Sequence, residues 1–462
     1  MVRSTRALSA SALFILVSGI AAPRSAAPAA DLPDALPRYR LEVGQELTYK
    51  EDSDFKYGKA PKQSSMANHS DWKIWVVRKN DDGSYRLVIH SAASMKFDGK
   101  NSDPPRSTLA YCDLFNDGRI VPNSTTGFRL NPANLFPRLP ADDRQARNGW
   151  KDIQKPEDAR SSFEVLSRPK SAAGVWTFRE VRVTPMDEIY LSTHKSTATF
   201  DPKRGLVTKI ETQTTQGYGI NGKGIGTEEF ISTEKHDADW SKKLSEQADR
   251  YFKANQAYQA KMTLASKDRN ASKKLLAEAK ALLVAAQKVA TLPVVKEQLD
   301  AQLKQHDPMA SYYTEEATRR AEMVGRPAAP FEAADLKGKT HALKDYRGKV
   351  VIMDFWYRGC GWCIRAMPQV KQLEEDFRDQ PVAVLGMNTD HNDTDAKFVI
   401  EKMGLTYLTL KAEGLPEKYG VRGFPTLVII DKEGKVQDLY VGYSPQLRQD
   451  VGEIVRRLLA KK

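Results

Sequence analysis

The chain has 462 residues, of which 40% are hydrophobic and 28% are charged, and its formal net charge is +12. No residue type dominates, so the length and composition predict two or three globular units, each with a core of its own. The positive charge is spread evenly along the sequence instead of forming one basic patch, which argues against nucleic-acid binding.

The first 30 residues predict a secretory signal peptide. Arg3 and Arg6 precede an apolar stretch from Ala7 to Ile20, and small residues and proline follow as far as Ala30. This is the order of the basic, hydrophobic and cleavage regions of such a signal. The apolar stretch is short for a membrane span, but an uncleaved signal that anchors the chain remains open. We therefore expect a periplasmic or otherwise extracytoplasmic protein, secreted across the inner membrane, where disulfides can persist.

Residues 31–236 predict an antiparallel β-rich domain of unknown role. Apolar and polar residues alternate in short runs, and turn-forming residues separate these runs at 80–84 and 201–205. Such alternation is typical of strands with one buried face, so we expect a sandwich or an open barrel. The acidic residues are dispersed and no nucleophile motif appears, so this domain predicts no catalytic site. Trp72, Trp75 and Trp176 are interpreted as core residues in preference to a ligand platform.

Cys112 is the odd one of three cysteines. Free cysteines are often buried and unreactive, and this is the favoured interpretation. A regulatory or substrate-docking role towards the other two cysteines remains the alternative.

Residues 237–323 predict an α-helical connector. Leu244, Ala248, Tyr251 and Tyr258 recur at helical spacing, and a stretch rich in Ala, Leu and Lys follows at 272–290. Pro293 suits the first turn of a further helix, expected over residues 294–305. We expect a helical hairpin or small bundle that serves as a spacer or docking platform.

The strongest functional signal lies at residues 350–363. A β-branched run predicts a buried strand at 350–353, and a helical apolar pattern follows Cys363. Cys360 therefore falls at a helix N-terminus, where unpaired N–H groups and the helix dipole favour a thiolate. Such an environment lowers a cysteine pKa from about 8.5 to roughly 3.5–7.5. Cys363 lies one turn further on, close enough to form a disulfide with Cys360.

Two other interpretations of this cysteine pair were weighed. A zinc site needs further Cys or His ligands at similar spacing, and the seven histidines are scattered singly. A structural disulfide does not require a strand-to-helix junction. The sequence therefore favours a dithiol–disulfide redox site and predicts neither a metal nor a cofactor.

Residues 324–462 resemble the thioredoxin-fold proteins, within the extracytoplasmic branch that includes the cytochrome c maturation thiol reductases. The segments that carry this resemblance, together with the Cys-X-X-Cys motif, are 325–331, 335–339, 343–351, 419–426 and 430–435. The lead-in before the cysteines is shared with the peroxiredoxins of the AhpC/TSA type. The pattern departs from the branch at Gly361–Trp362, where no proline lies between the cysteines, and at Ala366, where many members have glutamate.

The resemblance implies roles for residues around the cysteines. Pro425 matches the family's cis-proline, and Asp354 matches the buried acid that exchanges a proton with the second cysteine. An ordinary acidic residue at a strand end is the alternative for Asp354. The implied substrate contacts are Trp356, Trp362, Phe424 and Pro425.

The sequence thus predicts an α+β multidomain protein whose C-terminal domain, 324–462, is an α/β thioredoxin-like oxidoreductase. We expect Cys360 and Cys363 to reduce disulfides of extracytoplasmic protein substrates, with electrons from a membrane thiol donor implied by the resemblance. A disulfide-donating oxidase and a binding protein with a passive redox domain remain alternatives. A thiol peroxidase with antioxidant activity is a third, although Tyr357 stands where the peroxiredoxin pattern has Ser or Thr. The partner of the β-rich domain stays unknown.

Overall fold

The computed structural model describes residues 36–58, 63–101, 106–122, 134–153, 160–169, 174–184, 189, 191–217 and 222–461. The predicted signal peptide lies outside the described residues. In the N-terminal part the strands are β1 (Gln45–Tyr57), β2 (Ser64–Lys79), β3 (Tyr85–Phe97), β4 (Lys100–Asn101), β5 (Arg106–Leu114), β6 (Ile120–Pro122), β7 (Trp150–Ile153), β8 (Arg160–Ser167), β9 (Trp176–Val183), β10 (Thr193–Asp201), β11 (Leu206–Gln216) and β12 (Gly222–Lys235), with the short helix α1 (Asp143–Asn148). The connecting helices are α3 (Ala238–Ala265), α4 (Arg269–Val289) and α5 (Pro293–Met323).

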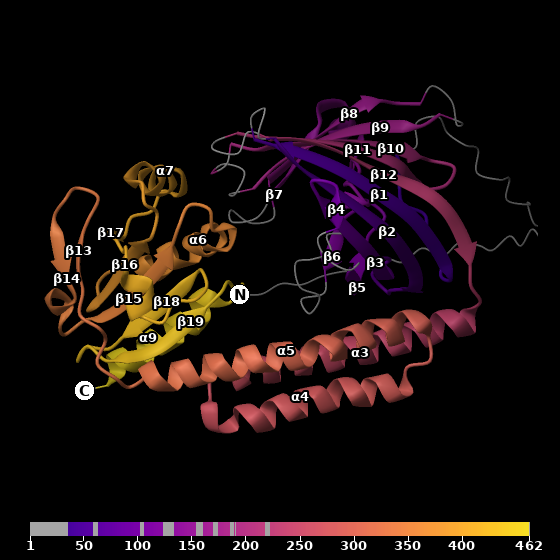
Figure 1. Ribbon diagram of the computed structural model, residues 1–462. Helices are drawn as coiled ribbons and strands as arrows, with labels where there is room; N and C mark the ends of the chain where they lie inside the picture. The colour runs from indigo at the N-terminus through magenta and orange to yellow at the C-terminus, as the bar shows by residue number, and fades with distance from the viewer. Residues whose placement is uncertain are drawn as a thin grey trace, which may run out of the picture.

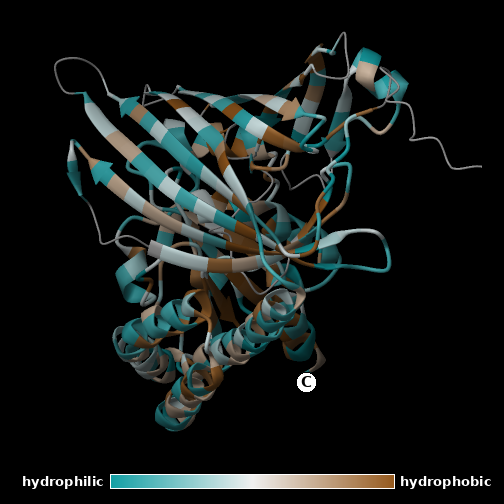
Figure 2. Cartoon of the chain, turned by 90° about the vertical axis from the view of Figure 1, so that its right-hand side faces the viewer, coloured by the Kyte–Doolittle hydropathy of each residue, from teal (hydrophilic) through white to brown (hydrophobic). Residues whose placement is uncertain are grey.

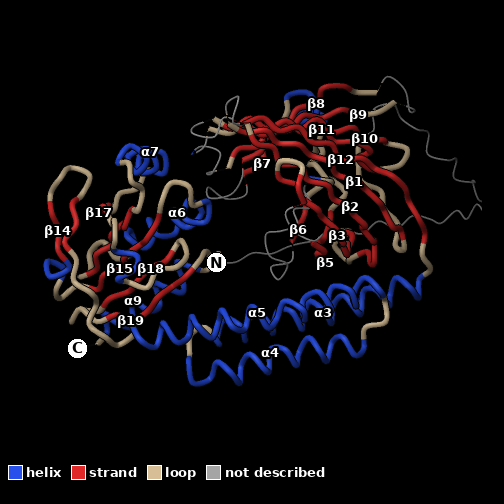
Figure 3. Tube along the Cα trace, viewed as in Figure 1, coloured by secondary structure: helices blue, strands red, loops and turns tan. Residues whose placement is uncertain are grey.

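The C-terminal part contains β13 (Glu332–Ala334), β14 (Thr340–Ala342), η2 (Leu343–Tyr346), β15 (Val350–Trp356), α6 (Gly361–Asp376), β16 (Val382–Asn388), α7 (Asp393–Met403), β17 (Leu408–Lys411), α8 (Leu415–Lys418), β18 (Thr426–Ile430), β19 (Val436–Val441) and α9 (Leu447–Ala460). Strands dominate the first part, three long helices the second, and the two types alternate in the third (Figure 3).

The N-terminal strands form one curved antiparallel sheet. Its described strands follow the order β6-β5-β3-β2-β1-β12-β11-β10-β9-β8-β7, and β4 pairs with β3. The hairpins β2–β3 and β10–β11 form at the turn sequences that predicted them. The antiparallel prediction is confirmed, but a two-sheet sandwich is wrong. The chain instead closes its core with segments that have no strand structure, among them Tyr39 and Phe136.

This core fills one face of the sheet. The alternate residues Leu47 and Tyr49 on β1, and Trp72 and Ile74 on β2, turn inward and are buried. Hydrophobic and hydrophilic bands alternate along the long strands in Figure 2, as a sheet with chemically distinct faces requires. Trp72 and Trp176 lie in this core, as the sequence predicted, and so does the fully buried Cys112. Burial raises the pKa of the Cys112 thiol far above its usual range, so Cys112 is an unreactive core residue.

Helices α3 and α5 pack against the opposite face of the sheet at β2, β3 and β5, and α4 packs on α3 and α5 away from the sheet (Figure 1). Asp237 and Asp268 cap α3 and α4 by accepting backbone N–H groups, and Pro293 occupies the first turn of α5. Helix α5 continues to Met323, well beyond the predicted end at residue 305, and carries Pro308 in its interior. The prediction stopped too early because tertiary packing sustains this helix, which contacts β5 at one end and β19 at the other.

The C-terminal part has a five-stranded sheet in the order β17-β16-β15-β18-β19. Strands β15, β16 and β17 are parallel, whereas β18 and β19 are antiparallel to their neighbours. Both faces of the central strand β15 are buried, with Ile352 and Trp356 in the core beneath α6 and Met353 and Phe355 in the opposite core. This is the thioredoxin-like arrangement that the resemblance implied, and the unit β16-α7-β17 lies between the cysteine motif and Pro425.

Candidate functional site

Cys360 and Cys363 form a disulfide at the start of α6. Cys360 is the N-cap residue, and its Sγ atom accepts a hydrogen bond of 3.0 Å from the backbone N of Cys363. Both residues are buried, with exposed fractions of 5% for Cys360 and 1% for Cys363, so Cys360 is the more accessible residue of the two. The free N–H groups of the first helical turn therefore point at the sulfur that a partner molecule can reach.

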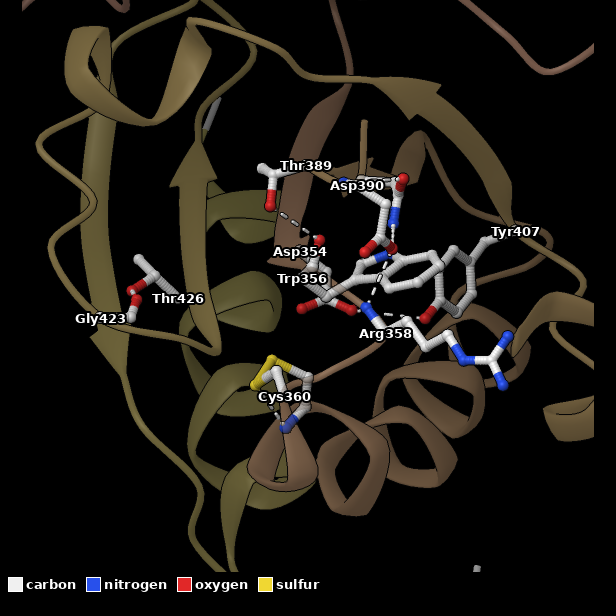
Figure 4. Close-up of a disulfide and its surroundings, with 11 residues drawn as sticks. Asp354, Trp356, Arg358, Cys360, Thr389, Asp390, Tyr407, Gly423 and Thr426 are labelled. Carbon is white, nitrogen blue, oxygen red and sulfur yellow. Dashed lines mark hydrogen bonds between the residues drawn. A yellow bond between two sulfur atoms is a disulfide. The ribbon is translucent and has the colours of Figure 1, made fainter. Parts of the chain in front are cut away.

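Asp354 lies on β15 and is drawn above the disulfide in the view of Figure 4. Its alternation with Ile352 and Trp356 places it on the α6 side of the sheet, where it is 1% exposed. The Tyr407 hydroxyl donates to Oδ2 over 3.3 Å, whereas Oδ1 is buried without a hydrogen-bond partner. Burial raises the pKa of Asp354 from 3.8 to about 7, and the Tyr407 hydrogen bond opposes this only in part. Asp354 can therefore exchange a proton near neutral pH.

The loop before β18 faces the disulfide from the other side. The Phe424–Pro425 peptide bond is cis, and the Thr426 hydroxyl donates to the Gly423 carbonyl over 2.7 Å. The Phe424 ring packs edge-on against Tyr357, with ring centroids 5.1 Å apart. Residues 423–425 and the cysteines thus lie on separate segments that β15 and β18 hold side by side.

The tryptophans of the motif lie in different environments. Trp362 is 45% exposed and stacks on Tyr443, whereas Trp356 is 0% exposed in the core under α6. A fully buried ring cannot touch a substrate, so the predicted contact by Trp356 is corrected to a supporting role. Gly386 makes room for this ring, because a Cβ atom there would lie 3.1 Å from Trp356 Nε1.

Arg358, two residues before Cys360, was not among the predicted site residues. Its backbone N donates to Asp390 Oδ2 over 2.9 Å, and its guanidinium pairs with Asp395 and lies over the Phe398 ring. The side chain extends away from Cys360 (Figure 4) and also donates to the carbonyl of Ile189, over 3.1 Å. The position of Arg358 within the motif was a signal in the sequence. Its contact with Ile189 could not be predicted from the local pattern, because Ile189 lies far away along the chain.

Ile189 belongs to the N-terminal part of the chain, between β9 and β10. Its side chain is 0% exposed and packs in the same cluster as Cys360, Cys363 and Trp356. The loop that carries the cysteines is therefore in direct contact with the β-rich domain.

The C-terminal part combines a thioredoxin-like sheet, a disulfide at a helix N-terminus and a buried acid beside it. These features define a thiol–disulfide redox domain. The model of the AhpC/TSA family matches residues 324–439.

Curated relatives match the same region. Thiol-disulfide oxidoreductase ResA of Geobacillus thermodenitrificans is 35% identical over 135 residues, which are 29% of this chain and 76% of that protein. ResA of Geobacillus kaustophilus is 34% identical over 134 residues, 29% of this chain and 75% of that protein. The chain therefore belongs to the thioredoxin-fold family of thiol-disulfide oxidoreductases that includes ResA, and it is an enzyme of that class.

A solved structure is similar over the same part of the chain. The putative thiol:disulfide interchange protein DsbE from Chlorobium tepidum is 28% identical and covers 30% of this chain and 98% of its own, with a TM-score of 0.29. These matches leave the β-rich and helical parts uncovered. Among the described residues, no helix combines the length and apolar character that a membrane-spanning helix requires.

Proposed function

We propose that this protein reduces disulfides in extracytoplasmic protein substrates through the Cys360–Cys363 dithiol. The observation that carries the proposal is the position of Cys360. Cys360 is the more exposed residue of the pair, it caps α6, and its Sγ atom accepts a hydrogen bond from the Cys363 N–H. These features favour a thiolate at Cys360 once the disulfide is reduced.

The reaction runs in two exchanges. The Cys360 thiolate attacks one sulfur of the substrate disulfide, which forms a mixed disulfide and releases the other substrate sulfur as a thiolate. Cys363 then loses its proton to Asp354, and its thiolate attacks the Cys360 sulfur. The second substrate thiol leaves. The enzyme has then lost two electrons and contains the Cys360–Cys363 disulfide. An external dithiol, by resemblance a membrane thiol donor, restores the reduced enzyme.

Substrate contact is proposed for Trp362, Phe424 and Pro425. Trp362 is half exposed beside the disulfide, and the loop with Phe424 and Pro425 lies across from it. The backbone of this bend, directly before β18, is proposed to pair with an extended substrate segment. The extracytoplasmic location rests on the signal sequence of the first 30 residues.

The test is insulin reduction by the full-length protein with dithiothreitol as donor. Cys360→Ser and Cys363→Ser should both lose turnover, and Cys112→Ser, a change in the distant core, should keep it if the variant folds. A reduction potential at or below about −200 mV would fit a reductase, whereas a value near −120 mV would fit an oxidase and contradict the proposal.

A further inference from the structure

The face of the β-rich sheet that carries the apolar core also has a polar half. Beyond the apolar core the same strands, together with Asn134 and Pro137, line a cavity of about 210 Å³ that is partly open to solvent. Side chains from β1, β9, β10, β11 and β12 line it. A volume of this size exceeds by far the ~10–15 Å³ that one water molecule needs, so it accommodates a small molecule.

The strand register explains where the cavity begins. Glu51 on β1 lies opposite Glu228 on β12, which in turn lies opposite Ile210 on β11. Ile210 lies at the edge of the apolar core, and Glu51 and Glu228 are the first residues of the polar half of this face.

The next row along the strands carries hydroxyl groups. Gly226 lies between Ser53 and Thr212, and Ser196 follows on β10. A Cβ atom on Gly226 would lie 2.5 Å from Thr212 Oγ1 and 3.2 Å from the Ser53 Cβ. A residue other than glycine would therefore collide with these side chains, and only glycine allows the row to pack so closely. The alternating Gly222, Gly224 and Gly226 are the signal in the sequence that could have revealed this floor.

Glu228 has an unsatisfied carboxyl oxygen. The residue is 5% exposed, and its Oε2 atom is buried without a hydrogen-bond partner. Glu51, opposite it, accepts a hydrogen bond of 3.1 Å from Trp72 Nε1. Burial and the neighbouring Glu51 raise the pKa of Glu228 to about 8. A buried polar atom without a partner is unfavourable, and in a native structure it calls for a missing partner.

We propose that this cavity binds a small polar molecule that carries a primary ammonium group, held between Glu51 and Glu228. An ammonium group has three donors and no acceptor, which matches two carboxylates with hydroxyl oxygens beside them. A divalent metal fits less well. Among the described residues the grouping that offers three metal ligands is Glu46, Glu234 and His236, and Glu46 already accepts hydrogen bonds from Lys73 and Trp75.

The charge of the site makes the proposal sensitive to pH. A bound ammonium favours the ionised form of Glu228, so binding releases a proton from this carboxyl below pH 8. The other titratable or charged groups that line the cavity with it are Glu51 on β1, Glu180 and Arg182 on β9, and Lys195 and His194 on β10. Affinity for an ammonium ligand should therefore rise between pH 6 and pH 8, by up to about tenfold per pH unit.

The test compares 4-amino-1-butanol with 1,4-butanediol, which has a hydroxyl in place of the ammonium, by calorimetric titration of the full-length protein. We expect the amine to bind about tenfold or more tightly, the magnitude of one charge-assisted contact. Glu228→Gln, which mimics the protonated form, should remove both the preference and the pH dependence. The Glu228→Gln variant retains His194, so it separates the contribution of Glu228 from that of His194.

Glu229→Gln is the matched control, because Glu229 is the next residue on β12, points to the opposite face and is exposed. It should keep the preference. Equal binding of the diol, no binding of either compound to the wild-type protein, or a preference that survives in Glu228→Gln would each overturn the proposal.

Discussion

Asp354 is the buried titratable residue beside the disulfide of the redox domain. Strand β15 carries this acid, with one oxygen bound by Tyr407 and the other without a partner. Its pKa of about 7 in the folded protein, against 3.8 ordinarily, means that the folded chain holds a proton that the unfolded chain releases. Stability therefore falls as the pH rises from 3.8 to about 7.

Asp354→Asn should accordingly stabilise the oxidised redox domain at pH 8. The pKa difference corresponds to about 4 kcal/mol, since each unit is worth about 1.4 kcal/mol. The gain should shrink to nothing below about pH 3, where the native acid is protonated in both states. Hydrogen exchange of the β15 amides, corrected for the intrinsic rate, measures it. Asp379→Asn, at an exposed position, is the control and should show no pH-dependent gain.

The same variant should slow catalysis at a defined step. Without the acid, Cys363 has no buried proton acceptor, so release of the mixed disulfide should slow by about 10- to 100-fold, a usual effect for a general base. Single-turnover kinetics between pH 6 and 9 measure it. Rates equal to those of the wild-type protein at every pH would reduce Asp354 to a structural residue.

At the scale of elements, helix α5 is the joint between the connector and the redox domain. Arg320, near its end, donates to the Leu439 carbonyl and pairs with Asp438 on β19. The side chains of Arg320 and Asp438 are 12% and 16% exposed. A second pair, Arg422 with Glu315, spans the same joint at 3.8 Å but is 69% and 71% exposed.

The two pairs should differ in their contribution to stability. Arg320→Ala leaves Asp438 largely buried and unpaired, and we expect a loss of about 3 kcal/mol in the protection of the β19 amides. Arg422→Ala, its matched control, should cost less than about 1 kcal/mol. Hydrogen exchange of β19 distinguishes them, and equal losses would mean that α5 is not held by the buried pair.

The sequence predicted these elements where local periodicity decides them. The run before Cys360 is a continuous apolar, β-branched strand, the residues after Cys363 follow a helical period, and the turn at 201–205 forms its hairpin. The sequence did not predict that the N-terminal strands form a single sheet, because alternation identifies a buried face but not the element that covers this face. The predicted helix ended too early, at residue 305, because the packing of α5 on two domains sustains it to Met323. Arg358 and Glu228 were missed because their partners lie far away along the chain.

On the scale of the whole molecule, the β-rich and redox domains both contact the helical platform, and they also touch each other (Figure 1). The described contact is Ile189, buried beside the cysteine motif, with its carbonyl bound by Arg358. The β-rich domain is therefore adjacent to the redox site.

Ile189→Asp should separate these two domains, because an unpaired charge in that apolar contact costs several kcal/mol. We expect a larger radius of gyration in small-angle X-ray scattering. Leu191→Asp is the control, since Leu191 is 54% exposed, and should leave the scattering curve unchanged. Identical curves for both variants would mean that Ile189 does not hold the domains together.

The central claim is that Cys360 attacks the substrate disulfide and Cys363 resolves the adduct. Its most direct measurement is mass spectrometry of the reduced Cys363→Ser and Cys360→Ser variants after mixing with an excess of a disulfide-containing peptide. We expect a stable mixed disulfide on Cys360 in Cys363→Ser and almost none in Cys360→Ser, because the remaining cysteine, Cys363, is only 1% exposed. An adduct that accumulates on Cys363 and not on Cys360 would contradict it.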